Sequence, residues 1–256
     1  MNEALAALLT EARGFLAGAF FVFLRVGGVM ALMPAFGERL IPARVRLVLT
    51  FAFTLIVSAG LEPAVTAGLG PLSFGLLGEA VIGLMIGLML RLFVLALQTA
   101  GAIIAQSISL SQMFGGTDGQ PQPAVGNMLL LAGLAAAVHL GLHVKLASLM
   151  IESYAAMPPG RLPDADLVRA WGLSGVRSTF SLGFSIAMPF VLAGLIYNVA
   201  LGAINRAMPQ LMVSFVGAPA LTFGGLVLLA IALPTGVMLW IGQFEAFLAS
   251  PFQVRP

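Results

Sequence analysis

Four long runs without a charged residue constrain the fold of this chain more than any other feature. They contain 26 to 38 residues each, and they are Leu92–Thr117, Gly119–Val144, Ser178–Asn205 and Ala207–Phe244. About 20 apolar residues cross the hydrocarbon core of a bilayer, so each run is long enough to span a membrane. Charged residues make up 9% of the chain, whereas soluble domains contain about 25%. The sequence therefore predicts an all-α, polytopic helical membrane protein.

The alternation of apolar and polar stretches predicts about six hydrophobic helical segments in a single integral membrane domain, residues 1–256. The third, at 72–111, is expected to be one long helix or a tight hairpin. The segment at 164–171 is expected to form a short interfacial helix. Prolines 189, 219 and 234 are expected to kink or break the last two spans. The expected spans are 14–36, 47–61, 72–111, 124–144, 178–205 and 211–243.

Single charged residues interrupt the apolar stretches. Arg25 is the only charged residue in Gly14–Phe36, and Glu79 and Arg91 flank the apolar run Ala80–Leu90. A charge at the centre of a lipid-facing helix costs roughly 2.5–3.5 kcal/mol on the lenient insertion scale. Two interpretations remain open. Either an arginine pairs with Glu79 inside the fold, or the four side chains line a polar space or contact another subunit, namely Arg25, Glu79, Arg91 and Arg206.

A second polar position lies between the last two spans. Arg206, Pro209 and Gln210 are expected to form a connecting turn that packs against neighbouring subunits. The spacings Gly14–Gly18 and Gly83–Gly87 place small residues four apart, which allows helix backbones to approach closely. Together with the charges inside apolar runs, these pairs favour close protein–protein packing.

Signals for catalysis or metal binding are weak in this sequence. His139 and His143 would share a helical face, but no acidic or cysteine ligand lies near them, and the chain has no cysteine. A Gly-x-Ser at Gly183–Ser185 lacks a credible histidine base for an intramembrane serine protease. The net charge of +2 comes from scattered basic residues, so no nucleic-acid surface is indicated. No enzyme activity, cofactor or metal is expected.

Two segments resemble the FliR family of flagellar export-gate membrane proteins, whose injectisome relatives are of the SctT type. In Arg25–Arg46 an arginine-bearing span ends in Pro-x-Phe-Gly and is followed by Pro-x-Arg-x-Arg, and Arg206–Pro219 reads RAMPQLMVSFVGAP. Between them, the family's LGxxxR and AGxxxxQxxS patterns are matched at Gly87, Arg91, Gly101, Gln106 and Ser109. The chain departs from the family's usual residues at Ala102, Met212, Ser214 and Ala218.

The resemblance implies a core subunit of the flagellar type III protein export gate in the bacterial inner membrane, at the flagellar basal body. FliP- and FliQ-like proteins would assemble with it, an FlhB-like protein would dock on it, and unfolded flagellar polypeptides would pass through the central pore. The glycine- and proline-rich stretch 113–123 cannot form a regular helix, and its place is similar to that of the family's pore plug. The expected plug residues are Gln106, Ser107, Ser109, Ser111, Gln112, Met113, Phe114, Gly115 and Gly116.

An alternative function is a secondary transporter or small-solute permease, which helices broken at Pro189 and Pro234 would suit. Such a protein is expected to show two repeated halves and intramembrane ionisable residues that form one site. No convincing repeat is present in the sequence.

Overall fold

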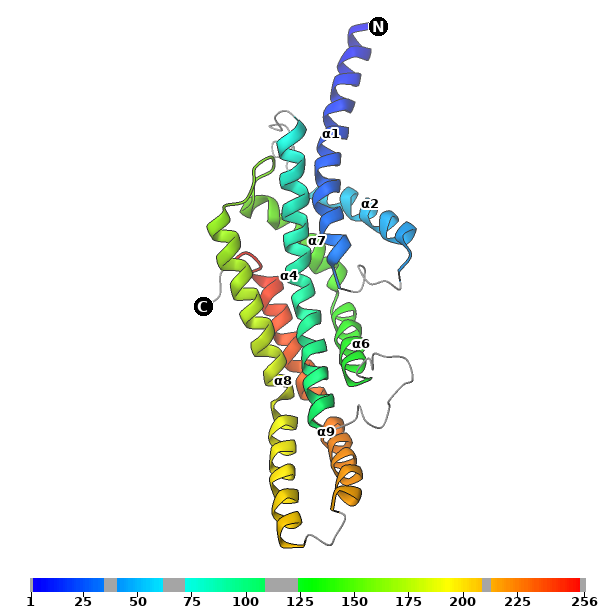
Figure 1. Ribbon diagram of the computed structural model, residues 1–256. Coiled ribbons are helices and arrows are strands. Elements are labelled where there is room, and N and C mark those ends of the chain that lie inside the picture. Colours follow the sequence, from blue (N-terminus) through cyan, green and yellow to red (C-terminus); the bar gives the residue numbers. More distant parts are fainter. Residues whose placement is uncertain (1, 35–40, 62–71, 109–123, 209–212, 254–256) are drawn as a thin grey trace. The chain divides into compact units, whose positions relative to one another are not determined.

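The computed structural model describes residues 2–34, 41–61, 72–108, 124–208 and 213–253 (Figure 1). Within these ranges the chain forms seven helices and no strand, as the all-α prediction requires. The helices are α1 (Asn2–Leu32), α2 (Ala43–Gly60), α4 (Leu72–Ser107), α6 (Ala124–His139), α7 (Leu142–Ala156), α8 (Ala165–Ala207) and α9 (Val213–Ala249).

Four helices, α2, α4, α8 and α9, are long and apolar enough to cross a membrane. The pair α6 and α7 gives a fifth if the two form one broken span, and Gly18–Leu32 of α1 is a shorter apolar helix. These are the six hydrophobic segments expected from the sequence. The helix α1 itself begins at Asn2, well before the predicted start, and ends just before Pro34.

The long segments are more continuous than the sequence indicates. The helix α4 is one helix and not a hairpin, and residues 164–171 form no separate interfacial helix because Ala165 already begins α8. Pro189 lies inside α8, and Pro219 and Pro234 lie inside α9, so none of them breaks its helix. A proline removes one backbone hydrogen bond of the helix. In an apolar environment the other backbone groups have no water to bond to, so they keep their hydrogen bonds within the helix and the helix continues.

The span predicted at 124–144 is wrong in one respect, because it is divided at Gly141. The helix α6 ends at His139, and α7 begins at Leu142. Gly141 between them has a φ of 78°, in the left-handed region that glycine adopts without steric cost. The uncharged run carries no sign of this break, because glycine is also frequent inside the continuous helices.

The described chain divides into two compact units. The first contains Met1–Leu92, Leu140–Gly175 and Phe247–Pro256, and the second contains Phe93–His139 and Val176–Ala246. In the first unit, α1 packs against α2 and α2 packs against α7. In the second unit, Trp240 is buried and donates from its indole nitrogen to the carbonyl oxygen of Phe93 at 2.8 Å. Its ring stacks on Phe244, with the ring centres 4.9 Å apart.

Candidate functional site

A close approach of α1 and α4 positions the polar site of the first unit. A Cβ atom on Gly28 would lie 2.8 Å from the backbone nitrogen of Leu84, and one on Gly87 would lie 2.9 Å from the carbonyl oxygen of Val29. A Cβ on Gly83 would collide with the carbonyl oxygen of Arg25. The predicted small-residue pair Gly83–Gly87 therefore forms a helix contact within this chain. This contact brings the Arg25 side chain to the turn of α4 that carries Glu79.

Arg25 and Glu79 form a buried, bidentate ion pair. The Nε of Arg25 donates to Oε2 of Glu79 at 2.7 Å, and its Nη2 donates to Oε1 at 3.0 Å. Their side chains are 1% and 0% exposed. The planar guanidinium matches the two carboxylate oxygens, and such paired bonds to charged groups are roughly twice as strong as neutral ones. For Arg25 and Glu79, the structure therefore forms the ion pair that one of the two interpretations expected.

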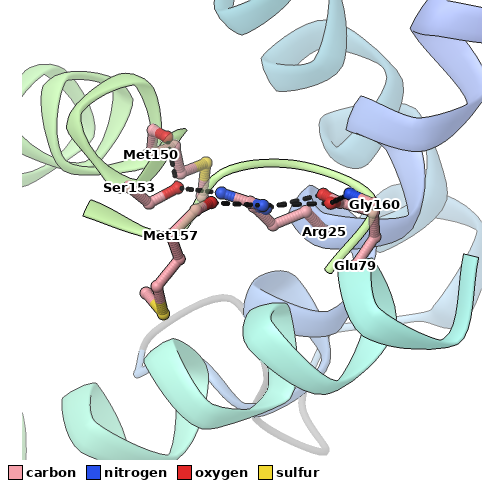
Figure 2. A network of polar contacts seen from close by, with 6 residues as sticks. All are labelled: Arg25, Glu79, Met150, Ser153, Met157 and Gly160. Atoms are coloured by element: carbon pink, nitrogen blue, oxygen red, sulfur yellow. Dashed lines mark hydrogen bonds and ion pairs between the residues drawn. The ribbon is translucent and has the colours of Figure 1, made fainter. Parts of the chain in front are cut away.

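Three further groups complete the hydrogen bonding of this pair (Figure 2). Arg25 donates from Nη1 to the Ser153 hydroxyl and from Nη2 to the carbonyl oxygen of Met157, both at 3.0 Å. Glu79 accepts a 3.2 Å hydrogen bond from the backbone N–H of Gly160. The Ser153 hydroxyl donates onward to the carbonyl oxygen of Met150 at 2.6 Å. The network therefore joins α1, α4, α7 and the connection that follows α7.

An aromatic ring covers the arginine. The guanidinium carbon of Arg25 lies 3.7 Å from the centre of the Tyr154 ring, a short cation–π contact. Four of the five guanidinium N–H groups have acceptors. The charges are thus neutralised and bonded within the chain, which is the arrangement expected of a structural pair.

The comparisons with known proteins cover both units. The family model of bacterial export proteins, family 1, matches residues 16–247. The chain belongs to this family. Flagellar biosynthetic protein FliR of Caulobacter vibrioides is 35% identical over 239 residues, which cover 90% of this chain and 94% of the relative. FliR of Aquifex aeolicus is 30% identical over 91% of this chain and 92% of the relative. FliR of Escherichia coli K12 is 28% identical over 84% of this chain and 84% of the relative.

Membership of the bacterial export proteins confirms the family resemblance read from the sequence, and the relatives' names suggest a protein that is not an enzyme. Within the described ranges, no group of three histidine, cysteine, aspartate or glutamate residues is placed to hold a metal ion. His139 ends α6 and His143 lies in α7, so the two do not share one helical face. The Ser185 hydroxyl donates to the carbonyl oxygen of Ser181 at 2.8 Å.

The other residues predicted from the sequence lie outside this network. Arg91 is half-buried on α4. Arg206 is exposed in the last turn of α8, where its positive charge interacts favourably with the negative end of the helix dipole. Gln106 is exposed, and the Ser107 hydroxyl donates to the carbonyl oxygen of Ile103 at 2.8 Å, so both still belong to α4. The remaining predicted residues lie outside the described part of the chain: Ser109, Ser111, Gln112, Met113, Phe114, Gly115, Gly116, Pro209 and Gln210.

Sequence reasoning missed the partners supplied by α7 and by its connection to α8. Ser153, Tyr154, Met157 and Gly160 fall in the stretch 145–177, whose charge density is typical of an exposed loop. The stretch offered one usable signal, the Pro158-Pro159-Gly160 sequence. This sequence marks a break after the helix, and its two prolines have no backbone N–H. The N–H of Gly160 then has no helical acceptor and needs a partner elsewhere in the fold.

Proposed function

We propose that this chain is a core subunit of the flagellar type III protein export gate. It assembles there with FliP- and FliQ-like proteins in the bacterial inner membrane, and an FlhB-like protein docks on the assembly. Membership of the bacterial export proteins, with relatives named flagellar biosynthetic protein FliR, supports a membrane component of the flagellar export apparatus. The finer assignment rests on the surface of α8.

Large apolar side chains are exposed along nearly the whole of α8. They begin at Leu167 and continue to Ile204, and several are more than half exposed. The most exposed are Leu173, Phe180, Leu195, Ile196 and Val199. An unburied apolar surface of this kind has to be covered by lipid or by protein.

The length of this surface favours protein as part of the cover. At 1.5 Å per residue, Leu167 to Ile204 spans about 55 Å along the helix, whereas the hydrocarbon core is about 30 Å thick. This length supports the proposal that neighbouring subunits cover part of the exposed face of α8.

The permease alternative gains no support from the site. A transport site needs ionisable groups open to a substrate, whereas the Arg25 and Glu79 side chains are buried and bonded to other groups of the chain. The pore plug at 106–123 and the docking turn with Arg206, Pro209 and Gln210 remain proposals that rest on the sequence.

The proposal can be tested by expressing the chain with and without FliP- and FliQ-like proteins. We expect the chain alone to aggregate or be degraded and the co-expressed chain to purify in one complex. A folded, monodisperse monomer in detergent would count against the assignment.

A matched pair of substitutions then tests the α8 surface. Leu173 on α8 is 69% exposed and lies between Arg169 and Arg177, and Ile231 on α9 is 70% exposed within an uncharged stretch. We expect Leu173→Asn to reduce the yield of the complex while membrane insertion is unchanged. Ile231→Asn should instead reduce insertion, because it places an amide in lipid. If Leu173→Asn gave the same yield of complex as the unmodified chain, the exposed face of α8 at Leu173 would not be a subunit contact.

A further inference from the structure

The connection between α7 and α8 has an unusual backbone. The N–H of Met157 still bonds to the carbonyl oxygen of Ser153 and closes the last turn of α7. Pro158 and Pro159 follow, and neither has a backbone N–H. Gly160, with a φ of 77°, is the first residue after Met157 that offers one.

Each member of the ion pair holds one backbone group of this connection. Arg25 donates to the carbonyl oxygen of Met157 on one side of the prolines, and Glu79 accepts from the N–H of Gly160 on the other. Both side chains are buried, and both bonds are charge-assisted. The bond to Met157 is buried, and the bond from Gly160 is part-buried. Figure 2 shows Arg25 between the two ends, with Glu79 beside Gly160.

The connection also lies directly on the backbone of α4. A Cβ atom on Gly75 would lie 3.2 Å from Cα of Gly160, and one on Gly78 would lie 3.0 Å from the carbonyl oxygen of Arg161. Two glycines on α4 thus leave room for the connection. Gly160 can follow this path because glycine tolerates a positive φ.

We infer that Arg25 and Glu79 are positioning residues that clamp the backbone of Met157–Gly160 against α4 and thereby fix where α8 begins. Pro158, Gly160 and Arg161 are exposed, so these two bonds tie solvent-facing, irregular backbone to the buried pair. Here the ion pair replaces the backbone bonds that end with α7. This role goes beyond the proposed export function and holds whether or not that function is correct.

Limited trypsin digestion tests this role, because Arg161 follows the clamped segment directly and is exposed. The full chain in isolated membranes, opened with mild detergent, is digested, and mass spectrometry compares cleavage after Arg161 with cleavage after Arg177. Arg177 is exposed within α8 and serves as the internal reference. Circular dichroism of the purified chain checks that each variant is folded.

The first variant is Arg25→Lys, which keeps a positive charge for Glu79 but loses the planar fork that also reaches Met157. We expect the ratio of Arg161 to Arg177 cleavage to rise about tenfold, since local opening free energy controls proteolysis. The double variant Arg25→Met/Glu79→Leu should raise it at least as much. Ser153→Ala is the control, because it removes a partner of Arg25 that lies outside the connection, and its ratio should not change.

A folded Arg25→Lys variant with the wild-type ratio would overturn the inference, and the pair would then be only a neutralised charge. The same conclusion would follow if Ser153→Ala raised the ratio as much as Arg25→Lys, because any loosening of the network would then suffice. If the double variant does not fold, Arg25→Lys decides the question alone.

Discussion

The Tyr154 ring lies face-on to the guanidinium group of Arg25, with 3.7 Å between the guanidinium carbon and the ring centre. The hydroxyl of Tyr154 is buried near the Glu79 carboxylate but makes no hydrogen bond of good geometry with a described residue. The ring is the part of Tyr154 that contacts the arginine. A cation–π contact removed from water is worth roughly 2 kcal/mol.

Tyr154→Phe should accordingly leave the protein as stable as before or stabilise it by up to about 1 kcal/mol, because it removes a buried hydroxyl without a partner. Tyr154→Leu should destabilise it by at least about 2 kcal/mol, because the cation–π contact is lost and packing changes. The measurement is thermal unfolding of the purified complex. If Tyr154→Phe proved as destabilising as Tyr154→Leu, the hydroxyl would contribute a hydrogen bond of its own, with Glu79 as the nearest acceptor.

Removing one charge of the buried pair should cost more than removing both. Glu79→Leu leaves Arg25 buried without its counter-ion, a loss of about 3–5 kcal/mol. Arg25→Met/Glu79→Leu should recover most of that loss, because apolar side chains of similar size replace a buried pair at little net cost. The steady-state level of the full chain in membranes reports the difference. Additive losses in the double variant would contradict the assignment of a neutralising pair.

Close contact between α1 and α4 makes Gly83 intolerant of a side chain. Gly83→Ala places a Cβ against the Arg25 backbone, so the helices must separate and the ion pair must lengthen. We expect a loss of about 1–3 kcal/mol, measured by chemical denaturation in detergent. Gly172→Ala is the matched control, since nothing lies within 4 Å of its Cβ. That helical substitution should be neutral or stabilise by up to about 1 kcal/mol.

Trp240 in the second unit combines a hydrogen bond with ring packing, and the two can be separated. Trp240→Phe keeps a ring beside Phe244 but loses the 2.8 Å bond to the Phe93 carbonyl oxygen. A loss of about 1 kcal/mol in unfolding free energy is expected. Trp240→Ala should cost about 3–5 kcal/mol, because it also leaves a cavity. Equal losses for the two variants would show that ring packing contributes little here.

The fold class and the family could be predicted from the sequence because both rest on local signals. Uncharged runs longer than a bilayer require helices, and motifs such as Arg25–Arg46 are read directly along the chain. The cost of an isolated charge in an apolar run also indicated that Arg25 needs a partner, with Glu79 as a candidate. These conclusions need no knowledge of how distant segments pack.

The remaining partners could not be predicted because they depend on tertiary packing. Ser153 and the Met157 carbonyl are ordinary groups that become specific only when α7 lies beside α1 and α4. The division at Gly141 was missed for a related reason. Its positive φ is set by the helices on either side, and the sequence alone does not distinguish this glycine from those inside the helices.

The connection between α7 and α8 resembles the kind of surface loop in which related proteins usually gain or lose residues freely. Insertions and deletions are not tolerated in this connection. The Met157 carbonyl and the Gly160 N–H bond to Arg25 and Glu79, and these two side chains are bonded to each other. Deleting one of the two prolines, or adding a residue between them, would move one backbone group away from its partner. The number of residues in this short stretch is therefore as strictly determined as the identity of the charged pair.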